Sequence, residues 1–150
     1  MKRDSKRQRT ILVVDDNAEV VDLLRLGLEQ SGFEIATAGD GLTALKHARA
    51  RVPDLILLDL VLPELDGFSV CEALRRERET AHIPIILLTG LSSELNRYAG
   101  LGCGANDYLA KPVDLKKLVT RINALLNAAE PSAPSTPAAS VNAPNTNLAT

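Results

Sequence analysis

Five polar side chains come directly after apolar stretches of this chain, at positions where buried strands would end. They are Asp15, Asp16, Asp59, Thr89 and Lys111. An ionised carboxylate is costly to bury without compensation, so an acid at the end of an apolar run is expected at a rim that faces a cation or a ligand. A single acid there means little, because turns and helix caps use Asp freely, but five suitable groups on four strand ends indicate one shared site.

Three carboxylates, one hydroxyl and one ammonium form a consistent chemical set. Carboxylates that meet at one site raise one another's proton affinity, and the Lys111 ammonium would offset only part of that repulsion. Mg²⁺ would offset more, and it prefers oxygen ligands, whereas the sequence has no cluster of His and Cys typical of zinc sites. A carboxylate beside Mg²⁺ and a Lys can attack phosphorus and form an aspartyl phosphate.

The elements that would position these side chains follow from apolar patterning. Apolar runs rich in branched residues predict strands at residues 10–14, 33–38, 55–59, 83–88 and 105–110. Helical spacing predicts five helices, which begin after Asn17, near Leu42, at Gly67, after Ser92 and Ser93, and after Asp114. Gly32 is expected to end the first helix. Strands that alternate with helices predict an α/β three-layer sandwich with a parallel sheet, whose ligand sites form at the carboxyl ends of the strands.

Both ends of the chain lack the apolar residues that a core requires. Residues 1–9 carry five basic side chains and are predicted to be disordered, while residues 129–150 are rich in Ala, Pro, Ser, Thr and Asn and are predicted to be a disordered tail or linker. The folded domain is therefore expected at residues 10–128. Within it, the run Arg75-Arg76-Glu77-Arg78-Glu79 is interpreted as a solvated charged face.

Composition argues against several classes of protein. The 150 residues, 45% of them hydrophobic, predict one globular core. A net charge of −2 argues against direct binding of nucleic acid, which favours a basic excess. There is no apolar run as long as a membrane span and no secretory signal, so we expect a cytoplasmic protein with no membrane partner. Cys71 and Cys103 lie in apolar contexts without CxxC spacing and are interpreted as reduced packing residues.

Four motifs resemble those of the receiver domains of two-component response regulators. They are Val13-Val14-Asp15-Asp16, Asp59-Leu60-Val61-Leu62-Pro63-Glu64-Leu65-Asp66-Gly67, Leu88-Thr89-Gly90, and Gly104-Ala105-Asn106-Asp107-Tyr108-Leu109-Ala110-Lys111-Pro112. The resemblance covers about residues 10–128. It implies the flavodoxin-like receiver fold of that family, with a five-stranded parallel sheet in the order 2-1-3-4-5.

The resemblance also implies a phosphoacceptor and a metal site. Asp59 would accept a phosphoryl group from the phosphohistidine of a sensor histidine kinase or of a histidine phosphotransfer protein. Asp15, Asp16, Asp59 and the backbone carbonyl of Val61 would hold Mg²⁺.

A switch is implied as well. Thr89 and Lys111 would contact the phosphoryl group, with a cis peptide bond between Lys111 and Pro112. Inward movement of Thr89 would make room for Tyr108 to rotate, which changes the face made of the fourth helix, the fifth strand and the fifth helix. A downstream protein or an output domain would read that face, or two copies of the chain would pair through it as a phosphorylation-dependent homodimer.

The expected function is therefore a signalling switch and not an enzyme, although the chain would assist its own phosphorylation and dephosphorylation. The main alternative is a receiver-like interaction module that works without phosphorylation, which the intact set of Asp, Thr and Lys disfavours. A haloacid-dehalogenase-type phosphatase would carry a second Asp two residues after the nucleophile, where this chain has Val61. A flavodoxin-like cofactor binder would not place Asp15-Asp16-Asn17 against a phosphate. Both a stand-alone regulator and part of a longer protein fit the sequence.

Overall fold

Strands and helices alternate along the chain in the computed structural model, which describes residues 7–90 and 102–129. The strands are β1 (Thr10–Val14), β2 (Glu34–Ala38), β3 (Leu55–Asp59), β4 (Ile85–Thr89) and β5 (Asp107–Ala110). The helices are α1 (Ala18–Gln30), α2 (Gly41–Ala50), α3 (Gly67–Arg76) and α5 (Leu115–Ala129). The helix predicted after Ser92 and Ser93, and most of both predicted disordered ends, lie outside the described residues.

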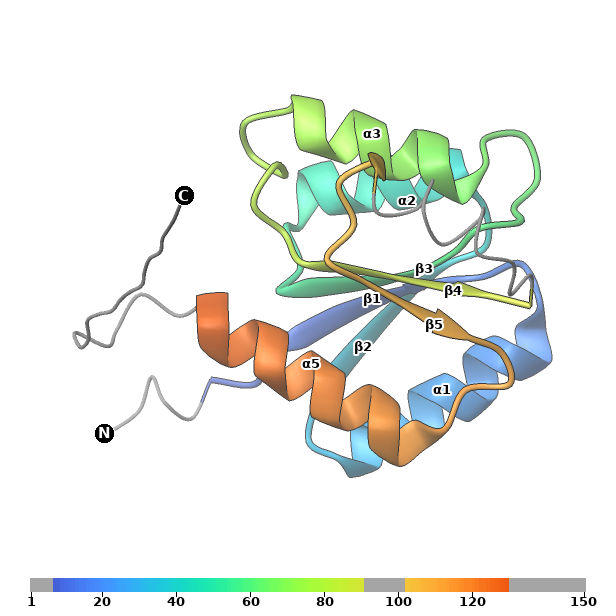
Figure 1. Ribbon diagram of the computed structural model, residues 1–150, viewed down its shortest axis with the longest axis vertical. Coiled ribbons are helices and arrows are strands. Elements are labelled where there is room, and N and C mark those ends of the chain that lie inside the picture. Colours follow the sequence, from blue (N-terminus) through green and yellow to red (C-terminus); the bar gives the residue numbers. More distant parts are fainter. Residues whose placement is uncertain (1–6, 91–101, 130–150) are drawn as a thin grey trace, which may run out of the picture.

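The five strands form one parallel sheet in the order β2-β1-β3-β4-β5, so the predicted fold class and strand order are confirmed (Figure 1). Across the sheet, Val14 pairs with Leu58, Asp59 with Leu88, and Thr89 with Ala110. This register brings the carboxyl ends of β1, β3, β4 and β5 to one edge of the sheet. The polar side chains predicted for these strand ends therefore start from neighbouring positions.

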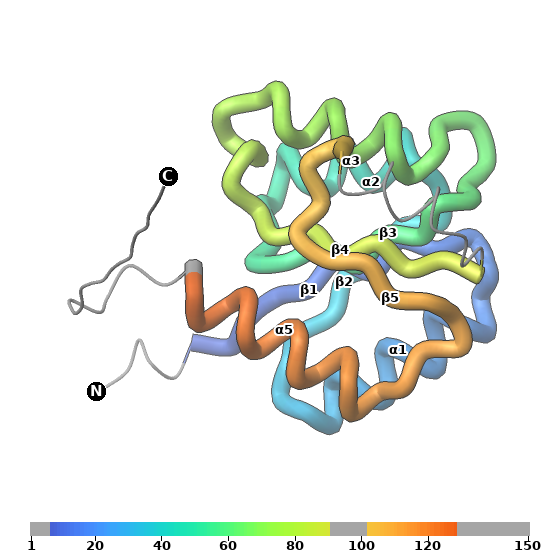
Figure 2. The backbone as a smooth tube through the Cα atoms, in the orientation of Figure 1, coloured from blue at the N-terminus to red at the C-terminus, as the bar shows by residue number. Residues whose placement is uncertain are grey.

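Helices cover both faces of the sheet, with α2 and α3 on one side and α1 and α5 on the other (Figures 1 and 2). Successive strand residues point to opposite faces, so Leu12 and Ile56 pack towards α2 and α3, whereas Ile11 and Leu57 pack towards α1 and α5. The central strands β1, β3 and β4 are buried on both faces, which explains their unbroken apolar runs. Each fully buried Leu or Ile contributes roughly 1.5–3 kcal/mol to stability.

Side-chain caps begin the helices close to the predicted positions. Asn17 Oδ1 accepts hydrogen bonds from the backbone N–H groups of Glu19 and Val20, at 2.9 and 3.3 Å. Asp114 Oδ1 accepts from the N–H of Lys117 at 3.3 Å. Gly32, with a φ of 99°, follows the end of α1, where a side chain would be strained.

Two strands begin two residues later than predicted: β4 starts at Ile85 and β5 at Asp107. Pro84 has no N–H to donate to a neighbouring strand, and the N–H of Ile83 donates instead to the carbonyl of Thr80 at 3.1 Å. The N–H of Ile85 donates to Asn106 Oδ1 at 2.8 Å. A side chain therefore satisfies the first backbone donor of β4, and strand pairing starts after it.

Three described residues of the N-terminal segment that was predicted to be disordered, Arg7, Gln8 and Arg9, contact the domain, and the Arg9 carbonyl accepts the N–H of Glu34 at 2.8 Å. The Arg7 guanidinium pairs with Asp54 at 3.0 Å, and the Gln8 amide donates to the carbonyl of Gly32 at 3.2 Å. Asp54 also accepts the N–H of Thr10 at 2.7 Å, so it holds the start of β1 beside the start of β3. None of the described helices combines the length and the apolar character that crossing a bilayer requires.

Candidate functional site

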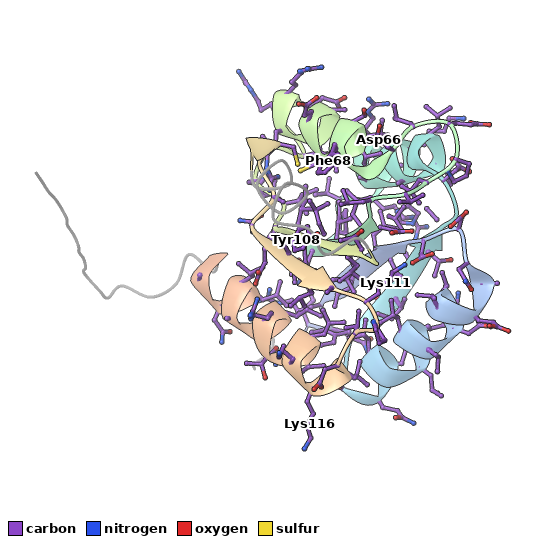
Figure 3. The ribbon with its side chains drawn as sticks, turned by 45° about the vertical axis from the view of Figure 1, so that its right-hand side comes forward. Asp66, Phe68, Tyr108, Lys111 and Lys116 are labelled. Atoms are coloured by element: carbon purple, nitrogen blue, oxygen red, sulfur yellow. The ribbon has the colours of Figure 1, made fainter. Side chains whose placement is uncertain are left out.

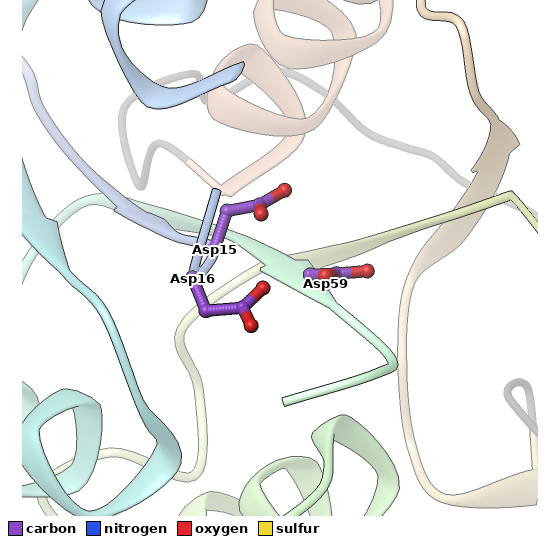
Figure 4. A group of neighbouring side chains, drawn as sticks. All are labelled: Asp15, Asp16 and Asp59. Atoms are coloured by element: carbon purple, nitrogen blue, oxygen red, sulfur yellow. The ribbon is translucent and has the colours of Figure 1, made fainter. Parts of the chain in front are cut away.

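Three carboxylates meet at the carboxyl edge of the sheet. Asp15 and Asp16 follow β1 and Asp59 ends β3, and one oxygen from each lies within 4.8 Å of the others (Figure 4). Asp15 and Asp59 are buried, with 3% and 6% of their surface exposed, whereas Asp16 is exposed. The cluster is thus open to solvent on the side of Asp16 and closed on the side of the sheet.

Lys111 directly follows β5, where Figure 3 labels it, and its side chain reaches this cluster. Its Nζ lies 2.7 Å from Asp15 Oδ2 and 3.5 Å from Asp59 Oδ1. The Lys111 backbone N–H donates to the carbonyl of Thr89 at 2.7 Å, and the peptide bond to Pro112 is cis, the form that the resemblance implies. The backbone of Lys111 is thereby attached to β4 while its ammonium crosses to the ends of β1 and β3.

Charge in the site is only partly balanced. Burial, followed by the charge of Asp15, raises the pKa of the Asp59 carboxyl, and Lys111 together with the N–H of Val61 opposes that rise. Burial alone would lower the pKa of Lys111, but its hydrogen bond to Asp15 and the charge of Asp59 outweigh burial and raise that pKa. One ammonium among three carboxylates leaves negative charge that a cation would compensate.

The loop between β3 and α3 is held close to Asp59 by a glycine. A Cβ atom at Gly67 would overlap the carbonyl oxygen of Asp59, and the Gly67 N–H donates to the carbonyl of Leu60 at 2.9 Å. Asp66 then caps α3 by accepting the N–H of Ser69 at 2.9 Å. The N–H of Val61 lies 3.4 Å from Asp59 Oδ1, so this loop keeps the exposed Val61 peptide beside the carboxylate.

Thr89 and Tyr108 lie on the same face of the sheet. Leu87, which pairs with Tyr108, belongs to the cluster that faces α2 and α3, and the alternation of β4 directs Thr89 to that face too. Tyr108 is half-buried and packs against the same cluster, while Thr89 is fully buried. Because Ala110 pairs with Thr89, the Tyr108 and Thr89 positions are diagonal neighbours.

Arg75, interpreted from the sequence as part of a solvated face, makes a set of contacts that the sequence did not predict. The Arg75 guanidinium donates to the carbonyls of Gly104, Ala81 and Ile83 at 2.8, 3.0 and 2.7 Å, and to Asn106 Oδ1 at 2.8 Å. The solvated interpretation is wrong for Arg75. Three of its four partners are backbone carbonyls, and two of the four, Gly104 and Asn106, are 29 and 31 residues away in sequence, so no spacing pattern identifies them.

Comparison with known proteins places this geometry in a family. The sequence model of the response regulator receiver domain matches residues 11–123. The chain belongs to this family. A solved response regulator from Chloroflexus aurantiacus is 36% identical, with a TM-score of 0.78 over 81% of this chain and 99% of that one.

Two further relatives indicate the context in which such receiver domains occur. The DNA-binding dual master transcriptional regulator RpaA of Synechocystis is 43% identical over 77% of this chain and 48% of its own length. The receiver domain of the sensor histidine kinase PA1611 from Pseudomonas aeruginosa, solved with magnesium coordinated in its active site cleft, is 31% identical, with a TM-score of 0.76 over 81% of this chain and 99% of that one. The chain spans about half or less of the curated relatives that it matches.

The donor set of this receiver domain fits a magnesium ion. Three carboxylates offer oxygen ligands within one small region, the site carries excess negative charge, and Asp16 leaves it open to solvent. The described residues include no group of His and Cys side chains placed to bind a metal together, so the oxygen-rich cluster is the site that matches a hard cation.

Proposed function

We propose that this receiver domain is a phosphorylation-controlled switch of a two-component system. In this proposal Asp59 accepts a phosphoryl group from the phosphohistidine of a sensor histidine kinase or of a histidine phosphotransfer protein. The observation that supports it best is the position of Lys111, whose ammonium contacts both Asp15 and Asp59 at the open end of the sheet. A lysine that only stabilised the fold would need one carboxylate as its partner. Here two buried carboxylates and a third, exposed one lie together, which is typical of a functional site.

The transfer itself needs little covalent chemistry from the protein. An oxygen of the Asp59 carboxylate attacks phosphorus, the new O–P bond forms as the P–N bond breaks, and the departing imidazole keeps the electron pair. Lys111 pairs with a phosphoryl oxygen and offsets its charge. Mg²⁺ held by Asp15, Asp16, Asp59 and the Val61 carbonyl would supply further positive charge to the transferring oxygens.

Thr89 and Tyr108 would transmit the phosphorylation of Asp59 to the surface of the domain. The Thr89 hydroxyl moves towards the phosphoryl group, and Tyr108 rotates into the space that this movement leaves. Their diagonal placement on one face of the sheet supports this coupling. The change alters the surface formed by β5, α5 and the helix predicted between β4 and β5, and a downstream protein, an output domain or a second copy of the chain reads it.

Intact-mass spectrometry after incubation with acetyl phosphate and Mg²⁺ tests the proposal. We expect the mass of one phosphoryl group to be added to the wild-type chain, and none to be added without Mg²⁺ or in Asp59→Asn. Asp66→Asn is the matched control, because Asp66 lies on the same loop and Asn caps a helix as well as Asp does. Equal uptake by Asp59→Asn and the wild type would contradict the proposal, and folded wild-type protein that takes up no phosphoryl group would favour an interaction module instead.

A further inference from the structure

The two cysteines of the chain, which the proposed function does not use, lie together inside the domain. Cys71 is fully buried on α3, and Cys103 is 7% exposed in the turn that leads to β5. The Cys71 thiol donates to the carbonyl of Cys103 at 3.4 Å, and both sulfurs belong to the core cluster that faces α2 and α3. Both residues are in the thiol form, as the sequence predicted.

The turn that carries Cys103 is held against α3 independently of the thiols. Arg75, one helical turn after Cys71, binds the carbonyl of Gly104 and the side chain of Asn106. Asn106 in turn accepts from the N–H of Ile85 at 2.8 Å and donates its own N–H to the carbonyl of Ile85 at 2.8 Å. The two cysteines, 32 residues apart in sequence, are therefore kept together by contacts other than their own.

Their surroundings make the two thiols chemically unequal. Interaction with the Cys71 thiol lowers the pKa of Cys103 to about 7, although burial opposes this, and the N–H of Ala105 helps to lower it. Hydrogen bonding with Cys103, followed by burial, raises the pKa of Cys71. Two charged residues of α3 act on the Cys71 thiol, with Arg75 lowering its pKa and Glu72 raising it, and Glu72 also opposes ionisation of Cys103. Cys103 is thus the better nucleophile of the pair at neutral pH, because the thiolate is the reactive form.

We propose that Cys71 and Cys103 are a redox modification site, at which hydrogen peroxide converts the two thiols into a reversible disulfide within one chain. The proposal rests on the buried contact between the cysteines and on the Arg75 contacts that hold it. Disulfides in cytosolic proteins are typically transient and redox-sensing, which suits a pair of thiols with no structural bond between them. The bond would tie α3 to the residues that lead into β5.

The reaction balances with hydrogen peroxide as the oxidant. The Cys103 thiolate attacks one peroxide oxygen, the O–O bond breaks, and the departing hydroxide takes up a proton to become water. The Cys71 sulfur then attacks the sulfenic sulfur of Cys103, the S–S bond forms, and the S–O bond breaks. The hydroxide that leaves combines with the Cys71 thiol proton as a second water. Two thiols lose two electrons in total, and a dithiol reductant returns them.

To test this, the reduced full chain is treated with hydrogen peroxide near neutral pH, and the remaining thiols are blocked with N-ethylmaleimide. Mass spectrometry then measures the mass of the intact chain and of its peptides, which are digested without reduction. We expect a monomer that has lost two hydrogens, takes up no maleimide, and yields a linked peptide pair containing Cys71 and Cys103. Dithiothreitol should restore both thiols. The oxidation rate should rise through pH about 7, as the Cys103 thiolate forms, and not only at the higher pH of an ordinary thiol.

Variants separate the roles of the two sulfurs. In Cys71→Ala, Cys103 lacks the second thiol that completes the disulfide, so its oxidation should stop at a sulfenic acid that dimedone traps. The reaction should also be slower at neutral pH than in the wild type, because contact with Cys71 lowers the pKa of Cys103. Cys103→Ala should leave Cys71 unreacted. The wild-type measurement stands even if either variant folds poorly. Two maleimide adducts after peroxide treatment, disulfides only between chains, or a sulfinic acid in the wild type would each overturn the proposal.

Discussion

Asp59 is buried beside Asp15, and burial together with the charge of Asp15 raises the pKa of its carboxyl. Lys111 relieves only part of this repulsion because it also pairs with Asp15 at the shorter distance. The ionised form of Asp59 is therefore disfavoured in the fold until a cation joins the site. A side chain whose ionised form lowers the stability of the folded chain is typical of a functional site.

Asp59→Asn should stabilise the metal-free protein. A carboxyl whose pKa is raised on folding contributes full stability below its unfolded pKa, and that contribution is lost as the pH rises through the folded pKa. Removing the charge should therefore raise the free energy of unfolding at neutral pH by about 1–2 kcal/mol, and by less near pH 4. Urea unfolding in EDTA at both pH values measures this, with Asp66→Asn as the control. A larger gain in acid than at neutral pH would contradict the argument.

The loop between β3 and α3 keeps its shape because Gly67 touches the backbone of Asp59. In Gly67→Ala the new methyl group would overlap the Asp59 carbonyl, so the loop must shift away from the site. We expect a loss of about 2 kcal/mol in the free energy of unfolding and slower phosphoryl uptake. Gly39→Ala is the matched control, because a Cβ atom there meets nothing within 4 Å, and its stability should change by less than about 0.5 kcal/mol. Equal effects in the two variants would contradict this account of the loop.

Helix α3 is attached to the starts of β4 and β5 through Arg75. Arg75→Met keeps much of the aliphatic side chain but removes four hydrogen bonds, leaving the carbonyls of Ile83, Ala81 and Gly104 without this donor. We expect a loss of about 2 kcal/mol, measured by urea unfolding. Arg76→Met, next to it on the exposed side of α3, should cost less than about 0.5 kcal/mol. If both variants were equally stable, the Arg75 contacts would not contribute to the fold.

Elements with a local pattern could be predicted from the sequence, and contacts between distant elements could not. The parallel sheet and the meeting of Asp15, Asp59 and Lys111 followed from apolar runs that end in polar residues, because parallel strands align their carboxyl ends. The Arg75 contacts and the pairing of Cys71 with Cys103 depend on how α3 meets the turn before β5. That packing appears only after the chain folds, so residue spacing carries no sign of it.

For the whole molecule, the site links metal binding to stability. A cation that binds only the folded chain should raise the free energy of unfolding by about 1.4 kcal/mol at ten times its dissociation constant. We expect Mg²⁺ to stabilise the wild type in this way and to stabilise Asp59→Asn much less, as measured by thermal unfolding at increasing Mg²⁺. The stabilisation by Mg²⁺ should weaken as the pH falls, because protons compete with Mg²⁺ for the Asp59 carboxylate, whose pKa is raised. Equal stabilisation of both proteins would place the cation elsewhere.

Light scattering after size exclusion, with Mg²⁺ alone and with Mg²⁺ plus beryllofluoride, tests whether a second copy of the chain binds the switched surface. A shift from monomer to dimer would support pairing of two chains through the surface formed by β5, α5 and the helix predicted between β4 and β5. A monomer in both states would mean that a different protein reads it.

Asp59, one of three clustered carboxylates, is the residue that we propose carries the phosphoryl group. Borohydride reduces an acyl phosphate to an alcohol, so the phosphorylated Asp becomes homoserine and tandem mass spectrometry of the peptides locates it. After treatment with acetyl phosphate and Mg²⁺, we predict homoserine at position 59 and unmodified Asp15 and Asp16. Homoserine at position 15 or 16 in place of 59, or none at any position in chain that has taken up a phosphoryl group, would contradict the account.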